Sequence, residues 1–179
     1  VVLHQGSVVA RSDGPGAGSE FTVRLPLPAV GEQRAPRGPV EDEMAGEPQR
    51  ILVVDDNPDS LESLSLLLGF SGNDVRTAAD GVTAVTVAEA FRPEVVLLDV
   101  GMPNMNGYDA CRLIRSFEWG RNMLLITLTG CGQEEDRERS RAAGFDQHFV
   151  KPVDPKVLIR YLGRHSAKRA ELQGNSQGG

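Results

Sequence analysis

Short apolar stretches alternate with segments of helical pattern along most of the chain, and this alternation restricts the fold more than any other feature. The stretches that read as strands are residues 51–54, 75–79, 95–98, 124–128 and 149–150. The first, residues 51–54, is a continuous apolar run of the kind expected of a buried parallel strand. Helix-starting residues follow them, as with Asn57 and Pro58 after the first stretch and Asp80 after the second. Strands separated by helices favour a parallel sheet that is covered on both faces.

Five such strand and helix units, in roughly 120 residues, have the size of one domain. Right-handed crossovers leave few ways to connect them. We therefore predict an α/β fold of the flavodoxin-like (βα)5 type, a doubly wound parallel sheet with strand order 2-1-3-4-5. This order places a crevice between the first and third strands, at their carboxyl ends.

Polar residues follow four of the predicted strands at that same edge of the sheet. They are Asp55, Asp56, Asp99, Thr129 and Lys151. The first and third strands are neighbours, so the three carboxylates should lie close together and repel one another without a counter-charge. Mg²⁺ prefers oxygen ligands and often bridges carboxylates to a phosphoryl group. The pattern predicts a magnesium site in which one carboxylate is the nucleophile that forms an aspartyl phosphate.

Each of these residues also has an ordinary structural interpretation. A lone Asp after a strand usually caps a helix, Thr129 could end a strand, and Lys151 could be a solvated charge. Five such residues at one edge of one sheet make the functional interpretation the better one.

Bulk properties exclude some classes of function. The chain has 179 residues and a net charge of −6, which disfavours a general nucleic-acid binder. No apolar run reaches the ~18–20 residues of a membrane span, and no signal peptide opens the chain, so we expect no membrane contact. The two cysteines, Cys111 and Cys131, fit no zinc spacing. We expect reduced thiols and a cytoplasmic location.

The sequence divides into four segments. They are residues 1–28, 29–48, 49–169 and 170–179. The first holds two short strands around a glycine-rich loop and looks like the edge of a larger domain. The second is rich in proline, glycine and acidic residues, as flexible linkers are, and the last should be a disordered tail. Because the chain does not begin with Met, we expect residue 1 to be a cut within a longer protein.

Four motifs of the α/β domain together resemble response-regulator receiver domains. They are ILVVDDNP at 51–58, LLDVGMP at 97–103 with NG at 106–107, LTG at 128–130, and FVKP at 149–152. The resemblance covers residues 50–169. It implies that Asp99 is phosphorylated, that Asp55 and Asp56 bind Mg²⁺, and that the Gly101 carbonyl completes the protein ligands. It also implies that Lys151 pairs with the phosphoryl group, that Thr129 moves toward it on activation, and that the bond before Pro152 is cis.

Two positions depart from the usual pattern of the family. Where a switch aromatic is common, this chain has His148, which could still move inward with Thr129 or could simply pack as a half-buried residue. The second residue after Asp99 is Gly101, which has no side chain to orient a water molecule. We hypothesise a long-lived phosphate, and a half-life of only seconds would contradict this.

Residues 2–26 resemble the last strands of a histidine-kinase ATP-binding domain, with a GAG box at 16–18. This resemblance implies a hybrid sensor histidine kinase, a phosphotransferase, as the parent protein. The helix and the earlier glycine boxes that would hold ATP are missing, so this chain should not phosphorylate anything itself. Neither His4 nor His165 is a candidate phosphodonor.

The leading interpretation is a receiver that accepts phosphate from a kinase histidine, in cis or in trans, and passes it to a downstream phosphotransfer protein or regulates its own kinase. The main alternative is an interaction module with a receiver fold that works without phosphorylation. An aspartyl-phosphate phosphatase is disfavoured, because those enzymes carry Asp-x-Asp on one strand end. A transcriptional regulator is disfavoured because no DNA-binding segment follows Arg169, so we expect no direct nucleic-acid contact.

Overall fold

The computed structural model describes residues 7–12, 14, 16, 18–24, 26, 47–130 and 134–174. The chain divides into two compact units, Val1–Asp42 and Glu43–Gly179. Most of the predicted linker, the predicted tail from 175 onward, and Cys131 lie outside the described residues.

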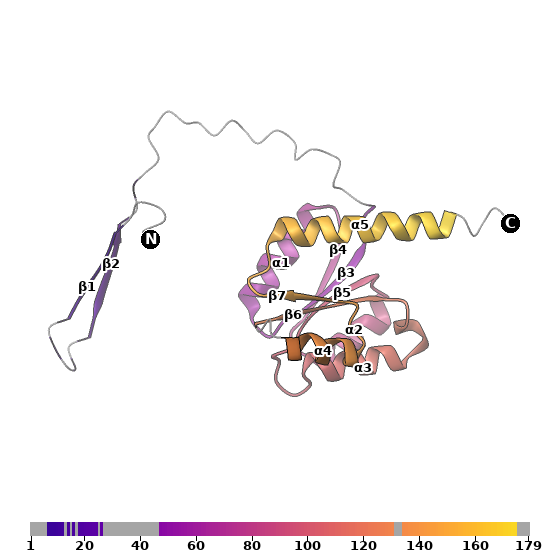
Figure 1. Ribbon diagram of the computed structural model, residues 1–179, viewed down its shortest axis with the longest axis horizontal. Coiled ribbons are helices and arrows are strands. Elements are labelled where there is room, and N and C mark those ends of the chain that lie inside the picture. The colour runs from indigo at the N-terminus through magenta and orange to yellow at the C-terminus, as the bar shows by residue number, and fades with distance from the viewer. Residues whose placement is uncertain are drawn as a thin grey trace, which may run out of the picture. The chain divides into compact units, whose positions relative to one another are not determined.

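The larger unit is built on a five-stranded parallel sheet (Figure 1). Its strands are β3 (Arg50–Val54), β4 (Asp74–Ala78), β5 (Val95–Asp99), β6 (Leu124–Thr129) and β7 (Gln147–Val150). They lie in the order β4-β3-β5-β6-β7, with every neighbouring pair parallel. In chain order this is 2-1-3-4-5, which confirms the predicted topology.

Five helices cover the two faces of this sheet (Figure 1). They are α1 (Pro58–Phe70), α2 (Gly81–Phe91), α3 (Gly107–Ser116), α4 (Glu134–Ala143) and α5 (Pro155–Gly174). Helices α1 and α5 lie on one face, and α2, α3 and α4 lie on the other. The arrangement is the doubly wound α/β fold expected from the sequence.

Local capping explains why three of the helices begin where they do. The side chain of Asn57 accepts from the N–H groups of Asp59 and Ser60, and Pro58 takes the first helical position of α1. Asp80 and Asn106 cap α2 and α3 in the same way. Each cap directly follows the turn that leaves a strand, so short-range chemistry sets the start of each helix.

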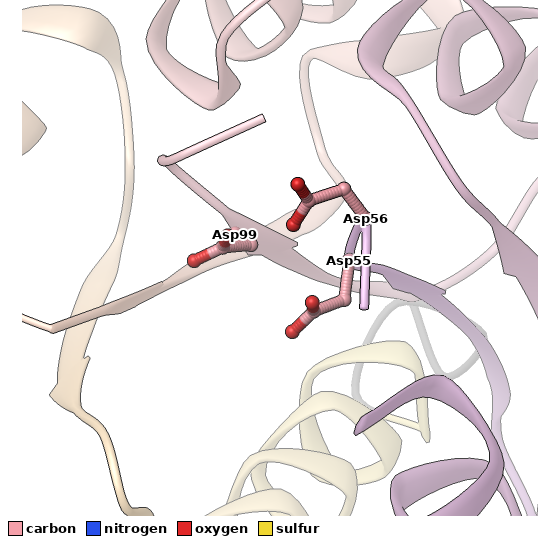
Figure 2. Close-up of side chains that lie close together, drawn as sticks. All are labelled: Asp55, Asp56 and Asp99. Atoms are coloured by element: carbon pink, nitrogen blue, oxygen red, sulfur yellow. The ribbon is translucent and has the colours of Figure 1, made fainter. Parts of the chain in front are cut away.

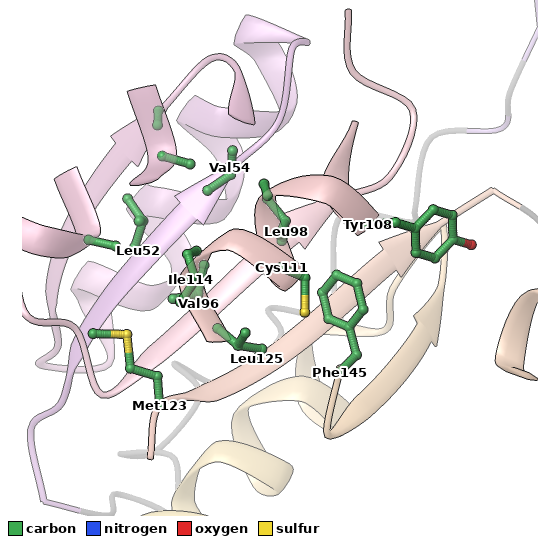
Figure 3. Packing of buried hydrophobic residues seen from close by; sticks show 14 of the residues in the cluster. Leu52, Val54, Val96, Leu98, Tyr108, Cys111, Ile114, Met123, Leu125 and Phe145 are labelled. Atoms are coloured by element: carbon green, nitrogen blue, oxygen red, sulfur yellow. The ribbon is translucent and has the colours of Figure 1, made fainter. Parts of the chain in front are cut away.

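Two apolar clusters, one on each face, form the core. The first joins alternate residues of the central strands, such as Leu52, Val96 and Leu125, to Cys111 and Ile114 of α3 (Figure 3). The second joins the intervening strand residues to Leu68 of α1 and to α5. All four apolar residues of β3 are fully buried, as expected of a central parallel strand.

The smaller unit contains one antiparallel hairpin of β1 (Ser7–Arg11) and β2 (Glu20–Arg24). Val8 pairs with Val23 and Ala10 with Phe21, so these four side chains share one face. All four are exposed, and Phe21 keeps 71% of its surface accessible. The hairpin therefore presents a bare apolar face.

Two features of the larger unit differ from the sequence prediction. Helix α5 runs to Gly174, so residues 170–174, which we expected in a disordered tail, are helical. This part of the chain contains no proline and keeps Ala170, Glu171 and Leu172, which are good helix formers. A 3-10 turn, η3 (Glu118–Gly120), also lies between α3 and β6. It was not predicted, because its three residues carry no periodic signal.

Candidate functional site

Three carboxylates meet at the carboxyl ends of β3 and β5. Asp55 and Asp56 follow β3, and Asp99 is the last residue of β5 (Figure 2). One carboxylate oxygen of each lies within 4.8 Å of the others. Asp55 and Asp99 are buried, whereas Asp56 is exposed. The parallel pairing of β3 with β5 produces this convergence, as the sequence predicted.

Lys151 brings a positive charge to the same cluster. Its Nζ donates to Asp55 at 2.6 Å and lies 3.0 Å from an oxygen of Asp99. Burial works against the charged ammonium, but hydrogen bonds and Coulomb attraction from the two carboxylates outweigh it, so the pKa of Lys151 is raised. The peptide bond between Lys151 and Pro152 is cis, as expected.

Backbone contacts fix the position of Asp55. Its N–H donates to the carbonyl of Ala78 at 3.2 Å, and one of its carboxylate oxygens accepts from the N–H of Asn57 at 2.9 Å. The other oxygen faces Lys151. Asp55 is therefore held by main-chain groups on one side and by an ammonium on the other.

The loop after Asp99 stays close to that residue. A Cβ on Gly101 would lie 3.6 Å from a carboxylate oxygen of Asp99, an ordinary contact distance. A Cβ on Gly107 would lie 2.2 Å from the backbone oxygen of Asp99, which is too close for any side chain. Glycine at position 107 is what lets helix α3 start directly against the end of β5.

Thr129 and His148, the predicted switch residues, lie on the two neighbouring strands β6 and β7. The carbonyl of buried Thr129 accepts from the N–H of Lys151 at 2.7 Å, which ties the end of β6 to the lysine. His148 is half-buried on β7, and its Nδ1 lies 3.2 Å from the hydroxyl of Ser140 in α4. The two residues do not occupy paired positions, since His148 pairs with Thr127.

The donor set fits Mg²⁺. All three side chains offer carboxylate oxygens, which hard divalent cations prefer, and the exposed position of Asp56 leaves room for water ligands. Gly101 places only backbone beside Asp99. A soft-metal site would need thiol or imidazole ligands, and this cluster has none.

Comparison with known proteins identifies the family. Residues 51–162 match the family model of the response regulator receiver domain. The chain therefore belongs to this family of phosphoacceptor domains of two-component systems.

Relatives with known sequences share this part of the chain. The DNA-binding response regulator MtrA of Mycolicibacterium smegmatis is 38% identical over 111 residues, which are 62% of this chain and 47% of MtrA. An uncharacterised 14.6 kDa protein of Leptolyngbya boryana is 36% identical over 115 residues, 64% of this chain and 88% of that protein. The chain spans about half the length of the DNA-binding regulators that it matches.

Solved structures show the same fold. The receiver domain of sensor histidine kinase PA1611 from Pseudomonas aeruginosa is 37% identical, with a TM-score of 0.63 over 67% of this chain and 98% of that domain. That structure holds a magnesium ion in its active-site cleft. Chemotaxis protein CheY4 of Vibrio cholerae is 31% identical, with a TM-score of 0.63 over 65% of this chain and 98% of that protein. Receiver domains bind Mg²⁺ in the acidic cleft that Asp55, Asp56 and Asp99 form here.

Sequence reasoning missed two polar features near the site. The hydroxyl of Thr127 is buried and has no hydrogen-bond partner among the described residues. Ser140 bonds to His148 from the opposite element. The bond from Ser140 to His148 has no signal in the sequence. Thr127 has a weak one, because it is the one polar residue in the apolar stretch 124–128.

Proposed function

We propose that Asp99 accepts a phosphoryl group from a phosphohistidine, with Mg²⁺ held by Asp55, Asp56, Asp99 and the backbone carbonyl of Gly101. One observation carries the proposal: three carboxylates lie within 4.8 Å of one another, and the ammonium of Lys151 is 3.0 Å from Asp99. In such a cluster the lysine ammonium, together with a cation held by the carboxylates, can neutralise the negative charge of the acceptor carboxylate and of the incoming phosphoryl oxygens.

The chemistry is a transfer between two nucleophiles. A carboxylate oxygen of Asp99 forms a bond to phosphorus as the bond from phosphorus to the imidazole nitrogen of the donor breaks. Bound Mg²⁺ would neutralise charge on the phosphoryl oxygens. Lys151 would turn from its two carboxylates toward a phosphoryl oxygen, and Thr129 would offer its hydroxyl to another. The main-chain bonds at Asp55 keep its carboxylate in place while Lys151 moves.

The wider context is proposed to be a hybrid histidine kinase that works in the cytoplasm. Residues 1–28 would be the end of its ATP-binding domain, and the bare apolar face of the hairpin suits a strand pair that belongs to a larger sheet. Solved relatives of the receiver include domains taken from histidine kinases of Pseudomonas aeruginosa and Syntrophus aciditrophicus. The phosphodonor would be a kinase histidine, in cis or in trans, and the next acceptor a phosphotransfer protein.

A DNA-binding response regulator is the second candidate context, because MtrA and its orthologues match the receiver. The segment before residue 50 favours the kinase. A hairpin with a glycine box precedes this receiver, and that segment resembles a kinase domain.

The test is intact mass spectrometry after incubation with acetyl phosphate and Mg²⁺. We expect one phosphoryl adduct that requires Mg²⁺ and is absent from Asp99→Asn. Matched substitution of the exposed Asp109, Asp109→Asn, should leave the adduct unchanged. Failure to phosphorylate with either acetyl phosphate or a phosphorylated kinase would favour the alternative, a receiver fold that binds partners without phosphorylation.

A further inference from the structure

The turn between β4 and α2 contacts two segments of the carboxylate site. Residues 78–81 make up this turn, from the last residue of β4 to the first residue of α2. The carbonyl of Ala78 accepts from the backbone N–H of Asp55 at 3.2 Å. Gly81, at the other end of the turn, lies against Met105 in the loop that follows β5. One turn therefore touches the chain where it leaves β3 and again where it leaves β5.

The contact at Gly81 leaves no room for a side chain. A Cβ at this position would lie 2.6 Å from the carbonyl oxygen of Met105 and 2.9 Å from its Cβ. The nearest of these atoms belongs to the main chain, so it cannot turn aside as the end of a long side chain would. Helix α2 cannot easily retreat either, because Ala84 and Ala88 are fully buried in the apolar core. Glycine is therefore what allows the loop to pack on the start of α2.

The β5–α3 loop, residues 100–106, is tied together by main-chain hydrogen bonds. The N–H of Gly107 donates to the carbonyl of Val100 at 3.2 Å, which closes the loop at its base. The N–H of Met105 donates to the carbonyl two residues earlier, at 2.8 Å. The side chain of Met105 also packs against the apolar core. Because the loop is closed in this way, a displacement at Met105 is passed on to Gly101.

We propose that Gly81 and Met105 are positioning residues for the metal site, and that their contact fixes the place of the Gly101 carbonyl. The inference rests on the proposed function, in which that carbonyl is a ligand of Mg²⁺. A main-chain ligand has no rotamers of its own, so its position depends on what supports the loop. Asp99 needs no such support, because it is part of β5 and pairs with Leu128 of β6.

Gly81→Ala should move the loop by about 1 Å, since a methyl group needs ~3.5 Å to its neighbours. The carboxylates would keep their places and the carbonyl ligand would shift. The affinity for Mg²⁺ should fall about tenfold, as is typical when a supporting contact at a metal site is lost. Phosphorylation by acetyl phosphate should slow at limiting Mg²⁺ and recover at saturating Mg²⁺, because Asp99 and Lys151 are unmoved.

The matched control is Gly120→Ala. Gly120 lies in η3, before the start of β6 and so at the opposite edge of the sheet. A Cβ there would also run into the main chain, at the carbonyl of Ile114. Both substitutions should destabilise the fold, but only Gly81→Ala should weaken Mg²⁺ binding in calorimetric titrations of the full chain. Unchanged Mg²⁺ affinity in Gly81→Ala, or an equal loss in Gly120→Ala, would overturn the proposal.

Met105→Ala tests the same contact from the loop, and it serves if Gly81→Ala does not fold. The loop loses its packing on α2 and on the apolar core, so the affinity for Mg²⁺ should fall about threefold or more. Met123→Ala makes the same change in a buried residue just before β6, at the opposite edge of the sheet, and should leave the Mg²⁺ affinity unchanged. Equal affinities in the two methionine variants would contradict the positioning role.

Amide hydrogen exchange of the metal-free chain gives a second measurement, which does not depend on Mg²⁺. The N–H groups of Met105 and Gly107 should exchange about tenfold faster in Gly81→Ala than in the unmodified chain, and this increase should be absent from Gly120→Ala. If the unmodified chain binds Mg²⁺ and Gly81→Ala matches it in affinity and exchange, only the positioning role is wrong. If the unmodified chain binds no Mg²⁺, the proposed function and this inference are both wrong.

Discussion

The ammonium of Lys151 bridges two acids, at 2.6 Å from a carboxylate oxygen of Asp55 and 3.0 Å from one of Asp99. The lysine thus contacts Asp55, a proposed metal ligand, more closely than it contacts Asp99, the proposed phosphoacceptor. These oxygens would also face a bound Mg²⁺, so the lysine and the metal compete for one set of lone pairs. The geometry predicts that a mutation of Lys151 can separate phosphoryl transfer from Mg²⁺ binding at this cluster.

Lys151→Ala should lower the rate of phosphorylation by acetyl phosphate by about 100-fold, because one fixed positive group at the transferring phosphoryl is lost. The affinity for Mg²⁺ should stay the same or rise, since the competing ammonium is gone. Calorimetric Mg²⁺ titration and mass spectrometry of the adduct measure the two effects. Lys156→Ala, an exposed lysine of α5, should change neither. Parallel loss of Mg²⁺ affinity and phosphorylation would contradict the prediction.

Gly107→Ala should reduce the free energy of unfolding by about 2 kcal/mol or more, because the new Cβ would lie 2.2 Å from the backbone oxygen of Asp99. Gly69→Ala is the matched control: it is helical, nothing lies within 4 Å of its Cβ position, and it should stabilise by about 1 kcal/mol. Urea denaturation compares the two. Similar values for both would mean that the loop after Asp99 relaxes at little cost.

Thr127→Val should raise the free energy of unfolding by about 1 kcal/mol. The Thr127 hydroxyl is fully buried without a partner among the described residues, and valine has nearly the same shape. Thr77→Val on the edge strand β4 is exposed and should change stability by less than about 0.5 kcal/mol. A destabilised Thr127→Val variant would show that the hydroxyl makes a bond in solution.

His165 should make stability depend on pH. Burial first, and then the nearby charges of Arg169 and Lys168, lower the pKa of His165. The unfolded chain then binds a proton more readily than the folded one, so the stabilising contribution is complete above about pH 6.5 and is lost as pH falls below it. His165→Gln should lose less stability than the unmodified chain between about pH 7 and pH 5 in urea titrations. Equal losses would assign the pH dependence to other groups.

Much of the fold could be predicted because its signals are local. Asn57, Asp80 and Asn106 cap helices through N–H groups two or three residues away, and the apolar stretches of β3, β5 and β6 predict buried strands. The edge strands β4 and β7 are only partly buried. The carboxylate cluster followed from strand order alone. Contacts between distant segments were not predictable. The bond from Ser140 to His148 and the anchoring of Asp146 by Arg115 depend on how α4 and α3 pack, which no local pattern encodes.

The register of the β1–β2 hairpin has a practical consequence for work with this chain. A strand pair keeps its register when one face is buried, and here Val8, Ala10, Phe21 and Val23 form a face that is exposed. Such a pair can slip, and its free edges can recruit strands of other molecules. Preparations that retain residues 7–24 should therefore be more prone to self-association than a version trimmed to residue 47, where the receiver begins with its own hydrogen bonds from Ser166 and Gln49.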